Sequence, residues 1–181
     1  TTATPPSHPP RPAPRTPSDR VVDQHIPATE GLFSGFAPVQ CRVQGTVGGK
    51  LASASPIGDC APVLLAMGAQ LILQCGEQQR QLPLEEFFTG YRQTRLQSGE
   101  FIHSVIIPSV TLSQKISLHK VSKRMDDDIS AVFAAMTISA DPQGRVEFVR
   151  IAYGGMAATA RTSVGPGRGV ERGGRRILNK N

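Results

Sequence analysis

The most constraining feature of the sequence is a run of small residues that starts at Gly45 and ends at the carboxylate Asp59. It contains the adjacent glycines Gly48 and Gly49 and few bulky side chains. Glycines accept positive φ values, and without Cβ atoms their backbone N–H groups come close to a ligand. Consecutive amides in such a turn form a concave site for an anion. The run therefore predicts a phosphate-binding turn; a plain turn between two strands is the alternative, because a lone glycine pair is a weak signal.

The whole-chain composition excludes several classes of protein. The chain has 181 residues, of which 39% are hydrophobic, enough for one domain or for one domain and part of another. Three widely spaced cysteines, Cys41, Cys60 and Cys75, predict neither a disulfide framework nor a metal or iron–sulfur site. No stretch approaches the roughly 18–20 apolar residues of a membrane span. We expect a cytoplasmic protein with no metal site and no membrane partner.

The charge distribution argues against nucleic-acid binding by the folded part. Of the net charge of +6, residues 161–181 carry +5 and residues 1–20 carry +2, which leaves −1 for residues 21–160. A nucleic-acid-binding domain needs a basic patch on a folded face. We therefore expect no nucleic-acid partner, although an Arg-Gly-rich terminus of this kind can bind RNA.

Both ends of the chain lack the pattern of a packed structure. Residues 1–30 begin with a Pro-rich stretch that has almost no apolar residue, and they are expected to form a disordered leader, with a docking tail as the alternative. Residues 159–181 show no periodicity and much Gly and Arg, and they are expected to be a disordered basic tail.

Between these ends, short apolar runs separated by turn residues predict an α+β fold with antiparallel strands. Asp59 stands at the expected N-cap of a short buried helix that ends at Gly68. A second short helix is expected over residues 84–88. The strands are expected at residues 39–43, 69–75, 79–82, 100–107 and 115–121 and in a hairpin of residues 129–138 and 146–153.

No catalytic triad, metal cluster or Walker loop is visible in the sequence. What remains is a set of groups suited to binding: the glycine run, Asp59, a lone basic residue Lys120, and the acidic run of residues 126–128. Three adjacent carboxylates repel one another, so such a run is either a solvated loop or an electrostatic element held near a cofactor or a basic partner.

Four motifs in register resemble the FAD domain of the xanthine dehydrogenase family, most closely its bacterial small subunit. They are Thr46-Val-Gly-Gly49 with Ala54-Ser-Pro-Ile-Gly-Asp59, Phe87-Phe-Thr-Gly-Tyr-Arg92, Lys120 with Arg124-Met-Asp-Asp-Asp-Ile129, and Ala152-Tyr-Gly-Gly-Met-Ala157. The resemblance covers roughly residues 31–158. It implies that residues 31–112 are the second half of a molybdopterin-dehydrogenase-type (PCMH-like) FAD domain. Residues 113–158 would begin an antiparallel-sheet domain like the C-terminal domain of carbon monoxide dehydrogenase flavoprotein.

The resemblance also implies a set of site residues. Those expected to bind FAD are Phe36, Thr46, Val47, Gly48, Gly49, Lys50, Asp59, Ile102 and Lys120. Tyr91 and Asp127 match positions near the nicotinamide nucleotide, and residues 121–130 match a mobile acidic loop beside the flavin. Lys50 departs from the family, which usually has Asn after the two glycines. Lys donates hydrogen bonds but cannot accept them, so local hydrogen bonding is expected to change.

Other family segments are not recognisable in this sequence. Neither the first FAD subdomain, with its own glycine-rich loop, nor the iron–sulfur domain is found, and the chain is therefore expected to be a fragment. On its own it is expected to bind FAD weakly or not at all. Iron–sulfur clusters and molybdopterin are expected on other domains or chains, and the expected partners are a molybdopterin-binding large subunit and an iron–sulfur domain.

The resemblance implies an oxidoreductase that oxidises a purine elsewhere and passes electrons from iron–sulfur clusters through FAD to NAD. Two alternatives remain open from the sequence. One is the FAD subunit of a carbon monoxide or aldehyde-type molybdenum dehydrogenase. The other is a non-catalytic remnant whose basic tail binds RNA or a protein partner.

Overall fold

The computed structural model describes residues 46–109, 113–123 and 129–166. Their elements form one four-stranded sheet, one three-stranded sheet and one two-stranded sheet, with three short helices. The helices are α4 (Val47–Ala52), α5 (Cys60–Ala66) and α6 (Leu84–Phe87). The strands are β1 (Gln70–Cys75), β2 (Gln78–Pro83), β3 (Phe88–Gly90), β4 (Gln93–Thr94), β5 (Phe101–Ile106), β6 (Gln114–Ser122), β7 (Ser130–Ala140), β8 (Val146–Gly154) and β9 (Arg161–Pro166).

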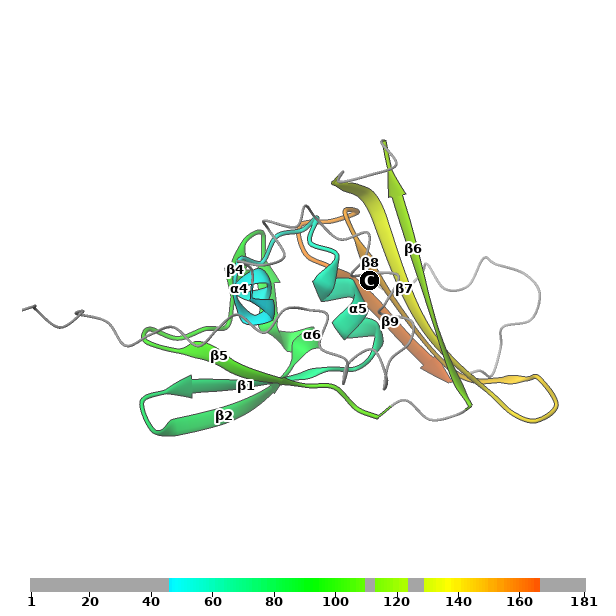
Figure 1. Cartoon of the computed structure of the whole chain (residues 1–181), viewed down its shortest axis with the longest axis horizontal. Helices are drawn as coiled ribbons and strands as arrows, with labels where there is room; N and C mark the ends of the chain where they lie inside the picture. Colours follow the sequence, from blue (N-terminus) through cyan, green and yellow to red (C-terminus); the bar gives the residue numbers. More distant parts are fainter. Residues whose placement is uncertain (1–45, 110–112, 124–128, 167–181) are drawn as a thin grey trace, which may run out of the picture.

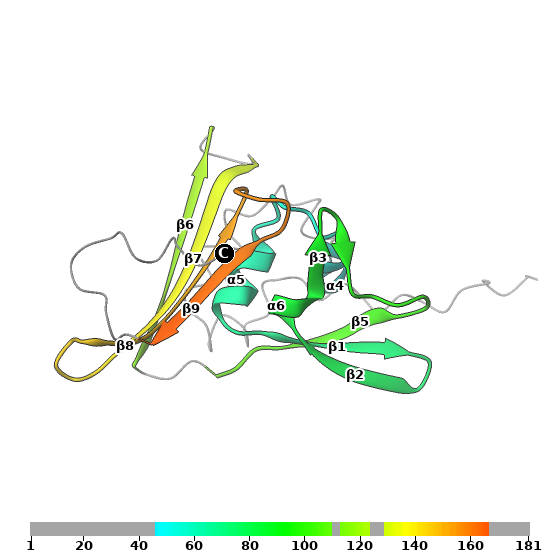
Figure 2. The ribbon, with the colours of Figure 1, turned by 180° about the vertical axis from the view of Figure 1, so that it is seen from behind.

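The α+β fold with antiparallel pairing is confirmed. The three-stranded sheet has the order β2-β1-β5 and the four-stranded sheet the order β6-β7-β8-β9, and all their neighbours are antiparallel. Figure 1 shows the two sheets on opposite sides of α5, and Figure 2 shows the same arrangement from behind. The strands expected at residues 69–75 and 79–82 pair as a hairpin, and the expected hairpin of residues 129–138 and 146–153 is present.

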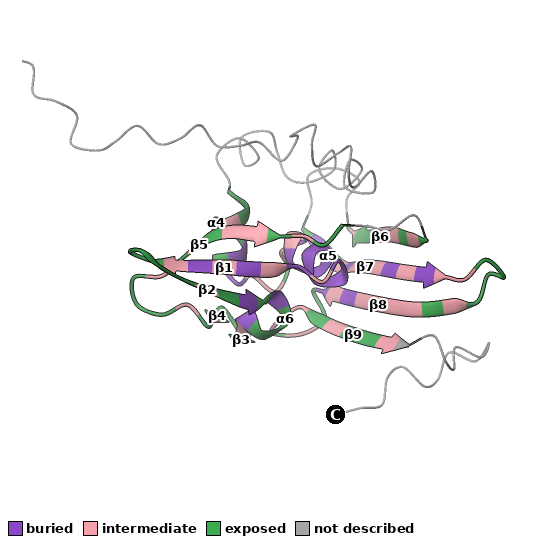
Figure 3. Cartoon of the chain, turned by 90° about the horizontal axis from the view of Figure 1, so that it is seen from below, coloured by how far each residue is buried: buried purple, intermediate pink, exposed green. Residues whose placement is uncertain are grey.

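Helix α5 forms the centre of the core. Six of its seven residues are buried, as expected for a helix that is apolar on all sides. It packs against β7 and β8 on one side, and α4 and α6 lie on its other sides. Figure 3 shows the buried residues concentrated in α5 and in the strands that flank it. A single apolar cluster includes Leu65 of α5, Leu71 of β1, Phe87 of α6 and Phe133 of β7, so the two larger sheets share one core.

The end of α5 follows the expected glycine stop. Gly68 has a φ of +69°, and the backbone N–H groups of Gly68 and Ala69 donate to the carbonyls of Leu65 and Leu64 at 3.0 and 2.9 Å. This geometry satisfies carbonyls that the helix end would otherwise leave unpaired, and glycine adopts it without the strain that a Cβ atom would bring.

Two expectations about the elements are corrected, and a third is not tested. The expected disordered tail of residues 159–181 is wrong at its start, because residues 161–166 form β9 and pair with β8 from Tyr153 to Phe148. The expected helix over residues 84–88 is only the four residues of α6, and Phe88 begins β3. The expected strand at residues 39–43 lies outside the described residues.

Candidate functional site

Within the glycine run, residues Val47–Ala52 form helix α4 in place of the expected turn. Gly48 and Gly49 lie in the first turn of α4, and neither has a positive φ. Thr46 caps the helix, because its Oγ1 accepts a hydrogen bond from the N–H of Gly49 at 3.0 Å. Leu51 is buried and anchors the helix to the core. The N-cap and this anchor offset the low helix propensity of two adjacent glycines.

Helix α4 packs against β5, with Gly48 facing Ile102. A Cβ atom on Gly48 would lie 3.4 Å from the carbonyl oxygen of Ile102 and 3.5 Å from its Cβ. Two of the expected cofactor-binding positions, Gly48 and Ile102, are therefore neighbours where α4 packs on β5. Val47, Gly49 and Lys50 are partly or fully exposed on the other faces of α4.

The most constrained polar group is a three-residue network at the start of α5. Asp59 is 6% exposed, and its two carboxylate oxygens have different partners. Oδ2 lies 3.3 Å from Nζ of Lys120 on β6, and Oδ1 accepts a 2.6 Å hydrogen bond from Oγ of Ser130 on β7. We call these three residues the Asp59 network. A buried carboxylate requires such partners, because its desolvation is costly.

The Asp59 network corrects two expectations. Asp59 stands at the N-cap position of α5, but its side chain makes no capping hydrogen bond there. Lys120 is not a lone cation, because it forms an ion pair with that same carboxylate. Ser130 was not among the expected site residues. A serine just after an acidic run gives no local sign that it will meet a residue 71 positions earlier.

Electrostatics connect the end of α4 with the Asp59 network. Burial, with the negative charge of Asp59 as the next cause, raises the pKa of the Cys60 thiol to about 11, while the positive charge of Lys50 opposes the rise. The Cys60 thiol therefore stays protonated at neutral pH. Helix α4 packs against α5, which begins directly after Asp59, so α4 and the Asp59 network lie in one region of the molecule.

Exposed apolar side chains border this region. Ile57 and Ile129 lie next in sequence to members of the Asp59 network or one residue away, Met156 follows Gly155, and all three are 43–65% exposed. Val121 is also 60% exposed, but it lies on the opposite face of β6 from Lys120, because it pairs with Val132 and Lys120 pairs with the buried Phe133. The N–H of Gly155 donates to the carbonyl of Pro56 at 2.8 Å, which joins the segment after β8 to the segment before α5. Apolar side chains around buried charges are typical of a surface that another group covers.

Of the remaining expected site residues, Tyr91 is the one within the described part of the chain. Tyr91 lies in the turn between β3 and β4, where it is 60% exposed and the guanidinium of Arg92 sits 5.8 Å from its ring centroid. Phe36 and Asp127 lie outside the described residues, as does the acidic run 126–128. Among the described residues no group of three potential metal ligands occurs, and no helix is long and apolar enough to cross a membrane.

Comparison with protein-family models gives two matches that follow each other along the chain. Residues 15–110 match the FAD binding domain in molybdopterin dehydrogenase, and residues 117–164 match the C-terminal domain of CO dehydrogenase flavoprotein. The first match covers more than half of the chain, and it begins within the stretch whose composition suggested a leader.

Several curated proteins are similar in sequence. The chain is 38% identical over 128 residues to nicotinate hydroxylase of Emericella nidulans, and 40% identical over 126 residues to xanthine dehydrogenase/oxidase of Gallus gallus. Each match covers 68% of this chain but only 10% and 9% of the relative, respectively. The chain thus spans about a tenth of the length of the curated relatives it matches.

Solved structures share the fold. Carbon monoxide dehydrogenase of Hydrogenophaga pseudoflava matches with a TM-score of 0.74 and 26% identity, over 80% of this chain and 50% of that chain. Quinoline 2-oxidoreductase of Pseudomonas putida 86 matches with a TM-score of 0.70 and 26% identity, with the same coverage.

Proposed function

The chain belongs to the family of FAD-binding domains of the molybdopterin dehydrogenases, and from that premise we propose that it is the FAD-binding portion of a xanthine dehydrogenase-type oxidoreductase. In the complete enzyme, electrons would pass from iron–sulfur clusters through FAD to NAD, in purine breakdown. The observation that carries the proposal is the Asp59 network, which holds a buried carboxylate and a lysine together beside exposed apolar side chains.

The residues of this region fit the chemical parts of FAD. A carboxylate has about four acceptor positions, so Asp59 can accept hydrogen bonds from hydroxyl or amide groups of a ligand while it keeps Ser130 and Lys120. The three apolar side chains that border the Asp59 network suit a planar ring system, and Lys120 supplies a positive charge that stabilises negative charge on a bound ligand. When bound, FAD would supply two-electron redox chemistry.

The other positions inferred from the resemblance are part of the same proposal. Phe36, Thr46, Val47, Gly48, Gly49, Lys50 and Ile102 would line the cofactor, and Tyr91 and Asp127 would lie near NAD. The division into residues 31–112 and 113–158 is likewise proposed. The proposed partners are a molybdopterin-binding subunit and an iron–sulfur domain, and the proposed location is the cytoplasm, in keeping with the free thiols of Cys60 and Cys75.

Reduction of added flavin by NADH tests this function. The full chain is mixed with FAD and then with NADH under anaerobic conditions, and the loss of visible flavin absorbance is followed against FAD and NADH without protein. We expect faster reduction with the chain, a slower rate for Lys120→Ala, and an unchanged rate for Lys115→Ala on the same strand. Equal rates for the wild-type chain and the two variants would contradict the proposal.

The second candidate is the FAD subunit of a carbon monoxide or aldehyde-type molybdenum dehydrogenase. The structural match to carbon monoxide dehydrogenase over half of that chain favours it. The two candidates differ in the electron acceptor. If the chain binds FAD but NADH does not reduce it, the second candidate is the better account.

A further inference from the structure

A second region with buried polar groups lies at the other end of α5. Along β7, the residues that face α5 change from apolar Phe133 and Ala135 to polar Thr137 and Ser139, although all four are buried. The register places Thr137 opposite Arg150 on β8 and Ile116 on β6. The inner face of the four-stranded sheet is therefore apolar near the Asp59 network and polar at its far end.

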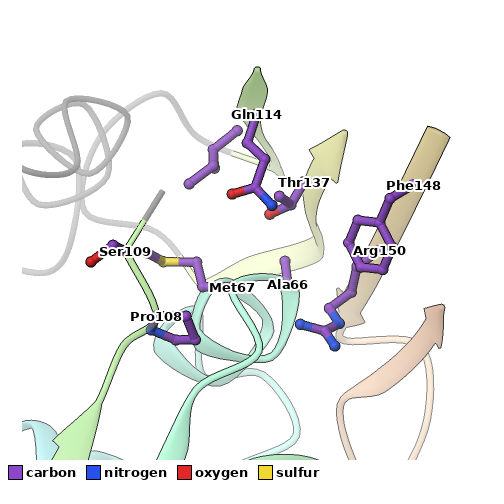
Figure 4. A pocket seen from close by; sticks show the side chains of 9 residues that line it. Ala66, Met67, Pro108, Ser109, Gln114, Thr137, Phe148 and Arg150 are labelled. Atoms are coloured by element: carbon purple, nitrogen blue, oxygen red, sulfur yellow. The ribbon is translucent and has the colours of Figure 1, made fainter. Parts of the chain in front are cut away.

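This polar end opens into a pocket of about 140 Å³ between the sheet and the end of α5. Met67, Ile116 and Phe148 give it apolar walls, and Thr137 and Arg150 give it polar ones. Figure 4 shows the side chains of Met67 just after α5, of Thr137 on β7, and of Phe148 and Arg150 on β8 around one space. The volume exceeds that of a single water but is well below the roughly 300–1,000 Å³ of a site for a drug-sized ligand.

Two hydrogen-bond donors on side chains that line this pocket have no hydrogen-bond acceptor within the described part of the chain. Thr137 is 5% exposed, and its Oγ1 has no hydrogen-bond partner among the described residues. The Nε of Arg150 is also buried without a hydrogen-bond partner, and its 3.6 Å separation from Oε1 of Glu85 is an ion-pair distance that is too long for a hydrogen bond. Buried polar groups are nearly always satisfied, so these two indicate a missing acceptor.

The guanidinium of Arg150 is held in place by its surroundings. It lies against Gly68, where a Cβ atom would collide with Nη1. Its Cζ is also 5.5 Å from the ring centroid of Phe148. A fixed guanidinium with five N–H donors is well suited to a carboxylate, which accepts through two oxygens at once.

We propose that this pocket is a binding site for a small monocarboxylate, whose carboxylate accepts from Thr137 and Arg150 and whose apolar part lies on Met67, Ile116 and Phe148. The site is separate from the Asp59 network, because the two lie at opposite ends of α5. It therefore does not depend on the proposed flavin function.

The test titrates the full chain, labelled with ¹³C at its methionine methyl groups, with sodium benzoate and in parallel with neutral benzamide. Met67 lines the pocket, and Met136 on the opposite face of β7 serves as an internal reference. We expect a saturable shift of the Met67 signal at millimolar benzoate, no shift of Met136, and much weaker binding of benzamide. Equal binding of the two probes, or no shift of Met67, would overturn the proposal.

Two threonine variants separate the pocket from the rest of the sheet. Thr137→Val removes only the buried hydroxyl, so it keeps the packing and should weaken benzoate binding about tenfold, which corresponds to one lost hydrogen bond. Thr162→Val is the matched control, because the hydroxyl oxygen of the half-buried Thr162 is also buried without a partner among the described residues, but Thr162 does not line the pocket. Unchanged benzoate affinity in Thr137→Val would refute the site.

Discussion

The hydrogen bond from Ser130 to Asp59 gives the sharpest stability prediction. Ser130→Ala removes a 2.6 Å bond to a buried carboxylate, and the donor is itself only 3% exposed. Hydrogen bonds to charged groups contribute about 1.5–3 kcal/mol, so the variant should lose about 2 kcal/mol of folding free energy. At about 2–4 °C per kcal/mol for a chain of this size, the Tm should fall by about 4–8 °C.

The assay is thermal unfolding followed by far-UV circular dichroism, with Ser139→Ala as the control. Ser139 is a buried serine on the same strand, but the partner of its hydroxyl is the neutral hydroxyl of Ser113, at 3.5 Å. Its loss should cost about 0.5–1 kcal/mol. If Ser130→Ala lowers the free energy of unfolding by no more than Ser139→Ala does, the hydrogen bond from Ser130 to the Asp59 carboxylate is not formed as described.

A double-mutant cycle extends this prediction to the whole Asp59 network. Ser130→Ala and Lys120→Met each remove one partner of the same carboxylate, so their effects should be coupled by at least about 0.5 kcal/mol. Effects that simply add would mean that Lys120 and Ser130 do not share Asp59.

Two further predictions concern other parts of the fold. The pKa of Glu100 is lowered from 4.5 to about 2, chiefly by the hydrogen bond from Arg80 and next by the one from the backbone N–H of Gln97. Because the folded state favours the ionised carboxylate, this interaction stabilises the fold above pH 4.5, and the stabilisation is lost as the pH falls toward 2. The difference in urea midpoint between wild type and Arg80→Gln should accordingly shrink over that range, and a pH-independent difference would contradict this. Gly68→Ala should destabilise the fold by more than Gly76→Ala, because both glycines have positive φ but only Gly68 lies against Arg150. Equal urea midpoints for the two variants would contradict the packing of Arg150 against Gly68.

Local patterns were sufficient for the elements that depend on neighbouring residues. Helix α5 follows from an apolar run bounded by Pro62 in its first turn and Gly68 after its end. The two hairpins follow from alternating residues on either side of turn signals. In these segments the sequence within a few residues decides the structure, because the turn or helix end is itself local.

The misjudged elements depend on distant partners. Two adjacent glycines disfavour a helix, and α4 forms because Thr46 caps it and Leu51 is buried against the core. Strand β9 is an edge strand that gains its place from backbone pairing with β8, which leaves little side-chain pattern to recognise. Ser130 reaches Asp59 only after β7 and α5 have packed.

The central claim is that the Asp59 network is part of an FAD site. Equilibrium binding of FAD tests this claim most directly. The full chain is titrated with FAD while flavin fluorescence is followed, for the wild type and for Asp59→Ala, Lys120→Ala and the control Lys115→Ala. We predict weak but saturable binding that Asp59→Ala and Lys120→Ala reduce and Lys115→Ala leaves unchanged. Binding that is the same in all four proteins would contradict the claim, whereas no binding by a folded wild-type chain would mean that the site needs the segments expected on the rest of the enzyme.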